Sequence, residues 1–184
     1  MGPGFDYPED GPSHHCIEEN SITFNYPNTR IFNPLTEVCL DRHYPNKDLR
    51  QNSNIIFSLL RKRLKKDSED ILFSEFTTIE GGYFYEGKNS ETIILCHGFT
   101  GVLCLDNFRK IIEKEISIII LTDLKSDITH LLKEKQKIIV WSESLIFSGF
   151  HSYHNQKINL AFRTSSLIHL GVNPNEVTPY YGDR

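Results

Sequence analysis

Several features that would narrow the function are missing from this 184-residue sequence. Its four cysteines include no Cys-x-x-Cys pair, so the sequence indicates neither a disulfide framework nor a redox motif. No apolar run is long enough to cross a bilayer, and we expect no signal peptide. Walker-type phosphate loops and GxGxxG dinucleotide loops are also absent. These absences predict an intracellular protein, cytoplasmic or nuclear, with no membrane span and no cofactor.

The sequence also has little net charge. Its 20 basic and 24 acidic residues leave a formal charge of −4 at pH 7, which gives no overall attraction to nucleic acid or to an anionic membrane. One basic run, residues 61–66, is interpreted either as an anion-binding or nuclear-import segment or as the solvated face of a helix. The second interpretation is favoured because Asp67, Glu69 and Asp70 follow, so nucleic acid is not an expected partner.

A group of possible metal ligands lies near the N-terminus. His14, His15 and Cys16 are contiguous, and Cys39 and His43 follow at a spacing that zinc sites tolerate. A zinc site usually takes two ligands from each of two tight turns, which a contiguous trio does not provide. We therefore expect no metal site.

What the sequence does contain is a regular alternation of apolar and polar segments. Apolar runs at 93–96, 116–121 and 138–141 are separated by polar intervals with helix-like spacing, which is typical of strand–helix–strand units. The sequence therefore predicts a single small α/β domain over residues 51–170, with a central, mostly parallel sheet flanked by helices. Further predicted elements are helices over 53–66 and 104–115 and strands over 71–79 and 157–162.

The two ends of the chain lack a sustained helix or strand period. Residues 1–50 are rich in Pro, Asn, Gly and His, and residues 171–184 are similarly loop-like, so both are predicted to be irregular arms. The arms nevertheless hold several aromatic side chains, within 22–44 and 172–181. Aromatic side chains outside a small core tend to be buried by a partner, so we expect protein partners to contact these two stretches.

The ends of the three apolar runs carry residues of catalytic interest. The first run ends in His97-Gly98, the second leads to Asp123, and the third leads into residues 142–146, Ser-Glu-Ser-Leu-Ile. In this order residues 79–160 resemble the first half of an α/β-hydrolase, in which the nucleophilic serine lies in a Gly-x-Ser-x-Gly elbow between a strand and a helix.

The α/β-hydrolase resemblance assigns roles to three residues. It implies that Ser144 is the nucleophile and that the backbone N–H groups of Phe99 and Leu145 form the oxyanion hole. Both elbow glycines are replaced, by Ser142 and Ile146, and no Asp or Glu lies between Ser144 and the later histidines. The resemblance therefore implies either a serine esterase or a pseudo-enzyme derived from one.

The same region also resembles a BRCT domain, a small partner-binding fold of nuclear proteins. Residues 127–132, Asp-Ile-Thr-His-Leu-Leu, match the Val-Thr-His-Leu phrase that the family carries in a strand. This resemblance implies a strand at 127–132, whereas the α/β-hydrolase resemblance implies a helix there. The conformation of this segment separates the two alternatives.

An organised α/β core without a complete catalytic constellation favours a function that is not catalytic. We therefore predict an interaction or scaffold subunit of a larger intracellular complex. The alternative is the α/β-hydrolase-type esterase or pseudo-enzyme with Ser144 as its nucleophile.

Overall fold

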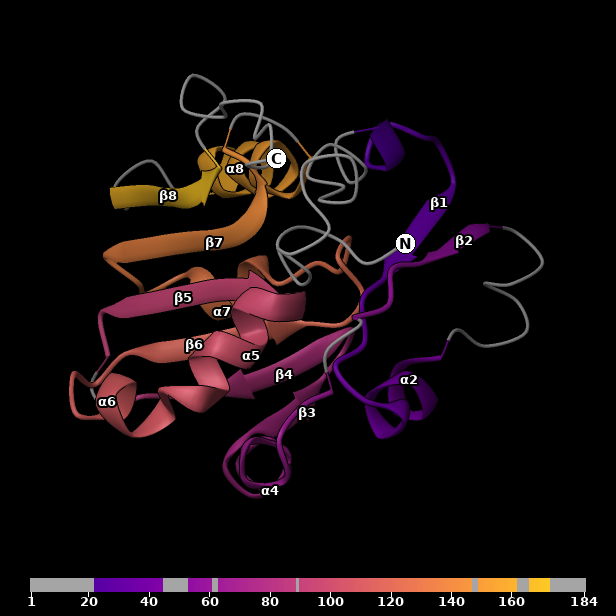
Figure 1. The fold of residues 1–184 in the computed structure, drawn as a ribbon. Helices are drawn as coiled ribbons and strands as arrows, with labels where there is room; N and C mark the ends of the chain where they lie inside the picture. The colour runs from indigo at the N-terminus through magenta and orange to yellow at the C-terminus, as the bar shows by residue number, and fades with distance from the viewer. Residues whose placement is uncertain are drawn as a thin grey trace, which may run out of the picture.

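The fold is built on a six-stranded sheet with the strand order β3-β4-β6-β5-β7-β8 (Figure 1). The computed structural model describes residues 22–44, 53–60, 63–88, 90–146, 149–161 and 166–172. The strands of this sheet are β3 (Thr77–Ile79), β4 (Gly82–Tyr85), β5 (Thr92–His97), β6 (Ser117–Leu121), β7 (Lys137–Leu145) and β8 (Ser166–Val172). Strands β5 to β8 are parallel, whereas β4 is antiparallel to both β3 and β6. The predicted α/β fold with a mostly parallel sheet is therefore confirmed.

Helices cover both faces of this sheet and divide the core into two apolar clusters. Alternate side chains of β5 point to opposite faces, so Ile93 and Leu95 lie in one cluster and Ile94 and Cys96 in the other. The first cluster is closed by α7 (Thr129–Leu132) and α8 (Gly149–Ala161), and the second by α4 (Lys66–Glu75), α5 (Gly98–Asp106) and α6 (Phe108–Ile112). Burial on both faces explains the uninterrupted apolar runs of the parallel strands.

The segment before the main sheet lies against the carboxyl end of β6. It contains β1 (Thr29–Phe32), α2 (Glu37–His43) and β2 (Asn54–Phe57), and β1 pairs with β2 in parallel. The Asn33 N–H donates to Thr122 O over 2.7 Å, and the Leu124 N–H donates to Ile31 O over 2.9 Å. Regular structure is therefore present within the stretch predicted as an irregular arm, and the predicted division of the chain at residue 50 stays a prediction.

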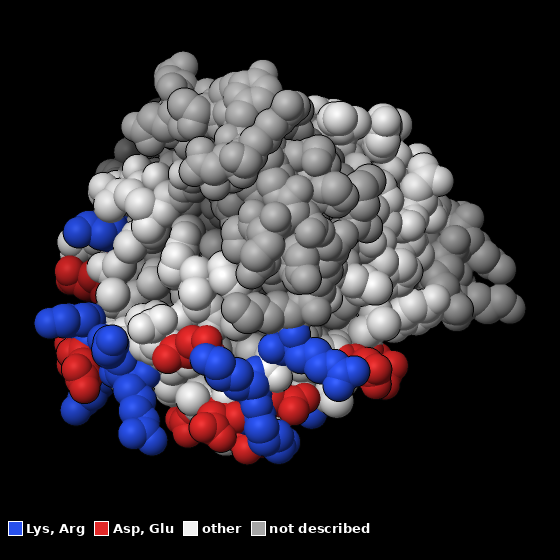
Figure 2. Space-filling view, viewed as in Figure 1, with Lys and Arg blue, Asp and Glu red and all other residues white. Residues whose placement is uncertain are grey.

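Charged side chains of both signs mix along the surface near α4 and α6. Figure 2 shows blue and red groups interleaved along the lower side of this view rather than separated by sign. Lys66 pairs with Asp70 over 2.8 Å, and Lys65 pairs with Asp106 over 2.9 Å. At these positions the basic run 61–66 is offset by neighbouring carboxylates. No helix in the described residues is both long and apolar enough to cross a membrane.

Several predicted elements differ from those observed. The predicted helix over 53–66 is wrong, because its first residues form β2 and helix α4 begins only at Lys66. The predicted strand over 71–79 is mostly the second half of α4, and 157–162 belongs largely to α8 rather than to a strand. Strand β2 exists because it pairs with β1, a partner 25 residues away in register, and such pairing is invisible to local periodicity.

Candidate functional site

The candidate site lies where two neighbouring parallel strands send their connections to opposite faces of the sheet. Strand β5 continues into α5 on one face, and its neighbour β7 continues toward α8 on the other. In open α/β sheets, ligands bind at such switch points, beside the carboxyl ends of the strands. Here that position holds His97, the last residue of β5, and Ser142, near the end of β7.

A continuous chain of hydrogen bonds joins the two strands to the N-terminal segment. The Asn33 amide nitrogen donates to Ser58 O over 2.6 Å, which leaves Asn33 Oδ1 to face His97 Nδ1 at 3.1 Å. His97 Nδ1 therefore carries the proton, and Nε2 accepts the hydroxyl of Ser142 over 2.9 Å. Ser142 Oγ in turn accepts the Ser144 hydroxyl over 2.7 Å and the Ser144 N–H over 3.1 Å.

Gly98 makes the contact between Asn33 and His97 sterically feasible. Its φ is +51°, and a Cβ at this position would lie 2.3 Å from Asn33 Oδ1. A residue with a side chain would therefore both strain the backbone and displace the amide that orients His97. The His-Gly sequence noted at the end of the first apolar run serves this close approach.

Three buried imidazoles surround the end of β5, and all of them are neutral at physiological pH. Burial lowers the pKa of His97 to about 3, helped by the neighbouring His151 and His154. Burial likewise lowers the pKa of His154 to about 3 and that of His151 to about 4. The Phe150 ring lies 4.4 Å from the His97 ring and 4.5 Å from the His154 ring, so an apolar side chain separates these imidazoles.

Helix α8 is fixed to its surroundings by two of these histidines. His154 Nε2 lies 3.0 Å from Leu124 O, which attaches the helix to the loop after β6. His151 Nδ1 lies 3.1 Å from His169 Nδ1, which attaches it to β8. Together with His97, these contacts make the carboxyl edge of the sheet a polar, hydrogen-bonded layer inside an otherwise apolar core.

The network has the atoms of a base and hydroxyl pair but is closed to solvent. An imidazole oriented by an amide and bonded to a serine hydroxyl is the arrangement that activates a nucleophile. His97 is 2% exposed and Ser142 is 1% exposed, and each of the atoms that they share is already bonded. In this state the network fastens Asn33, at the start of the β1–α2 connection, to the sheet edge.

The structure does not assemble the serine-hydrolase site that the sequence suggested. Ser144 lies within strand β7, is 2% exposed, and bonds to Ser142, so it does not lie in a strand-to-helix elbow. Phe99 is the second residue of α5 and Leu145 is the last residue of β7. Their role as oxyanion donors came only from the α/β-hydrolase resemblance and stays a prediction. Among the described residues, no three His, Cys, Asp or Glu side chains are grouped to hold a metal ion.

Asn33 is the member of the network that sequence analysis missed. It lies 64 residues before His97, and nothing in local periodicity connects the two. The available signal is its position, since Asn33-Pro34 directly follows the apolar pair Ile31-Phe32. A polar residue at the end of an apolar strand is a candidate for a site at the edge of a sheet.

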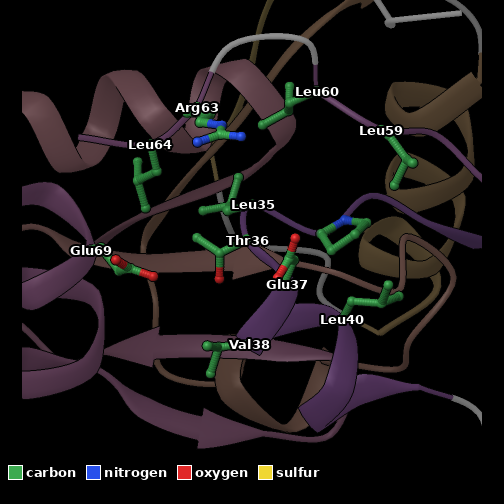
Figure 3. A pocket seen from close by; sticks show the side chains of 11 residues that line it. Leu35, Thr36, Glu37, Val38, Leu40, Leu59, Leu60, Arg63, Leu64 and Glu69 are labelled. Carbon is green, nitrogen blue, oxygen red and sulfur yellow. The ribbon is translucent and has the colours of Figure 1, made fainter. Parts of the chain in front are cut away.

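An apolar groove of about 550 Å³ lies beside the segment that the network holds (Figure 3). Its walls come from the β1–α2 connection, α2, the stretch after β2 and the first turn of α4. The lining residues are Pro34, Leu35, Thr36, Glu37, Val38, Leu40, Leu59, Leu60, Arg63, Leu64 and Glu69. Leu59 is 53% exposed and Val38 is 40% exposed, so the groove offers apolar surface with two carboxylates and one guanidinium for polar contacts.

Replacing Ser142 by Ala is expected to lower the free energy of unfolding by about 1 to 3 kcal/mol, because it leaves His97 Nε2 and the Ser144 N–H buried without partners. Ser144→Ala is expected to cost less, about 1 kcal/mol, because it removes only one bond of the Ser142 hydroxyl. Urea unfolding followed by circular dichroism at pH 7.5 measures both. A loss for Ser144→Ala equal to or larger than that for Ser142→Ala contradicts the central position of Ser142.

The sheet order and the helices on its two faces define a known class of fold. No family profile and no curated protein matches the sequence. The structure, however, has the α/β fold of a transketolase domain, of the C-terminal type, with a mixed and mostly parallel sheet.

Three solved structures illustrate this likeness. A split-gene transketolase, described as an "inactive beta4 tetramer" (a subunit name, unrelated to strand β4), matches with a TM-score of 0.68 and 17% identity over 94% of this chain and 55% of that chain. Transketolase from Campylobacter jejuni subsp. jejuni matches with a TM-score of 0.64 and 20% identity, over 94% of this chain and 26% of that one. Transketolase from Leishmania mexicana matches with a TM-score of 0.59 and 12% identity, over 92% and 24%. This chain therefore spans between about a quarter and about half of the transketolase chains that it matches.

These neighbours correct both family resemblances and the predicted function. The fold is that of transketolases, not of an α/β-hydrolase or a BRCT domain. Residues 129–132 form helix α7 rather than the strand that the BRCT resemblance required. The predicted scaffold subunit and the alternative serine esterase or pseudo-enzyme are likewise wrong, because the fold belongs to domains of a different enzyme.

Proposed function

We propose that this chain is a domain of a transketolase-type enzyme and acts together with parts that these 184 residues do not contain. The observation that carries the proposal is the asymmetry of the structural match. Nearly the whole chain, 94%, superposes on transketolase, yet it accounts for only 26% of the Campylobacter enzyme. The split-gene neighbour supports the same conclusion, because that transketolase is divided between genes and its β4 tetramer is inactive.

The groove is the surface at which we place the contact with the rest of the enzyme. Part of its wall, from Pro34 to Leu40, belongs to the stretch 22–44 in which the sequence predicted a partner contact, and the apolar side chains of Val38 and Leu59 are exposed. Tyr44, at the end of the same stretch, stacks on Phe57 of β2 with ring centres 5.9 Å apart, and both side chains are exposed. The second predicted contact stretch, 172–181, lies outside the described residues except for Val172. An intracellular location, cytoplasmic or nuclear, remains part of this proposal.

The buried network supports this role by fixing the groove wall. Asn33, which bonds to His97, immediately precedes Pro34, Leu35 and Thr36 of the groove. A wall held on a rigid sheet edge keeps its shape without a partner present, so less ordering free energy is lost on binding.

Reconstitution tests the proposal. The full chain is mixed with Campylobacter transketolase from which the matched quarter has been deleted, and ketol transfer between sugar phosphates is measured alongside light scattering after gel filtration. Each part alone is expected to be inactive, and the mixture is expected to co-elute and to regain activity. A folded chain that neither co-elutes with the truncated enzyme nor restores activity refutes the proposal.

A matched pair of variants places the contact. Leu59→Glu puts a charge on the groove wall, whereas Leu160→Glu puts one on α8 at a side chain that is 81% exposed. The first is expected to weaken co-elution at least tenfold, because a carboxylate must be desolvated in an apolar interface. The second is expected to have no effect.

A further inference from the structure

Within the described part of the chain, strand β8 forms an edge of the main sheet that no other strand pairs with. It is the last strand in the sheet order, and among the described residues it pairs only with β7. Its seven residues, Ser-Leu-Ile-His-Leu-Gly-Val, include no proline, lysine, arginine or carboxylate. Natural edge strands usually carry such residues because a bare edge offers unpaired N–H and C=O groups to any other extended chain. Strand β8 therefore has the properties of a strand that pairs with a partner.

An apolar sheet face continues from β7 onto this edge. In the sheet register Ile168 lies beside Ile139, and Leu170 lies beside Trp141. Residues in register on neighbouring strands share a face, so these four side chains lie on the face that α5 covers farther along the sheet. Figure 1 shows α5 over β5 and β6, away from β8. Ile168 is 36% exposed and Leu170 is 45% exposed, so the apolar face ends in open surface at β8.

We propose that β8 pairs with β8 of a second copy of this chain, antiparallel and about a two-fold axis perpendicular to the sheet. The choice of a second copy rests on the proposed function, because the split-gene neighbour is described as a β4 tetramer. It also follows from self-complementarity: two identical uncharged strands satisfy each other's edge groups, and no charge loses its water.

One register of this pairing uses the whole strand. An axis through His169, the middle residue of β8, overlaps all seven residues of both strands. It sets Ile168 opposite Leu170 of the second copy on each side of the axis. A perpendicular two-fold axis keeps the apolar residues of both strands on one face. Ile168 and Leu170 of both copies, flanked by the two Trp141 rings, then form one continuous patch. The His169 side chains lie on the other face, where each already contacts His151 of its own chain.

The oligomeric state of the full chain tests the surface. Light scattering after gel filtration at about 100 µM is expected to give a dimer of twice 21.3 kDa. Leu170→Lys is expected to raise the dimer dissociation constant at least tenfold while the circular dichroism spectrum stays that of a folded chain. The matched control Leu160→Lys, on the exposed side of α8, is expected to remain dimeric. A monomeric wild-type chain overturns the inference, and so does a dimer that Leu170→Lys leaves intact.

Engineered cysteines test the register, in a background with Cys16→Ser. Opposed residues of antiparallel strands are about 5 Å apart at Cα, which a disulfide can bridge, whereas positions displaced by two residues are about 7 to 8 Å apart. The double variant Ile168→Cys/Leu170→Cys is expected to form a covalent dimer on oxidation, and neither single variant is. Cross-linking of a single variant overturns the register. These readouts use the chain alone, so they fail or succeed separately from the reconstitution that tests the proposed function.

Discussion

Replacing Arg30 by Met is expected to lower the free energy of unfolding by about 3 to 5 kcal/mol, because it leaves the Asp123 carboxylate buried and unpaired. The Asp123 side chain is 2% exposed and forms an ion pair with Arg30 of β1, with two guanidinium nitrogens on one carboxylate oxygen. Methionine keeps much of the volume of the arginine stem, so the loss of stability comes mainly from removing the guanidinium charge and not from lost packing. Urea unfolding followed by circular dichroism at pH 7.5 measures it, with an accompanying fall in melting temperature of about 6 to 20 °C.

Two further variants separate the ion pair from general damage. The double variant Arg30→Met/Asp123→Asn is expected to be more stable than Arg30→Met alone, because the second change removes the stranded charge. Lys65→Met breaks an ion pair with Asp106 in which the lysine is 73% exposed, and it is expected to cost less than about 1 kcal/mol. Equal losses for Arg30→Met and Lys65→Met contradict the view that the Arg30–Asp123 pair anchors the N-terminal segment.

The parallel strands were predictable because burial on both faces gives them continuous apolar sequence. The runs at 93–96, 116–121 and 138–141 correspond to β5, β6 and β7. Helix α8 was not predictable in the same way, because two of its core positions hold His151 and His154. These count as polar in a hydropathy pattern, although both are at most 1% exposed. The pattern therefore reported a strand where the structure has a helix.

The candidate site was predictable only in part for a related reason. His97 follows an apolar run and stood out, and Ser142 was noted as the residue that breaks the elbow motif. Their connection to Asn33 depends on β1 lying across the sheet edge, which is a long-range contact with no local signature. The two family resemblances failed because strand–helix–strand units with small residues at their turns occur in many unrelated folds.

Acidification is expected to unfold the protein with a midpoint between about pH 4 and 5.5, because three buried imidazoles must stay neutral in the folded state. Burial holds the pKa of His97 and His154 at about 3 and that of His151 at about 4, against 6.5 in an unfolded chain. Below pH 6.5 the unfolded chain therefore binds protons that the folded chain does not. Each imidazole then lowers the free energy of unfolding by about 1.4 kcal/mol per pH unit, and the three together by about 4. A typical domain stability of about 5 to 15 kcal/mol is therefore largely lost when the pH falls two to three units below 6.5.

A single variant tests whether these histidines set the slope of the free energy of unfolding against pH. His154→Gln is expected to lower stability at pH 7.5, since it weakens the contact with Leu124 O, and to reduce the slope below pH 6 by about a third. The matched control is His130→Gln, at an exposed position of α7, which is expected to leave the slope unchanged. Urea unfolding at pH 7.5, 6.0, 5.5 and 5.0 gives the slopes. A wild-type slope below about 1.5 kcal/mol per pH unit contradicts the neutral buried layer. Because this layer joins β5, α8, β8 and the groove wall, its protonation is expected to disassemble the candidate site together with the fold.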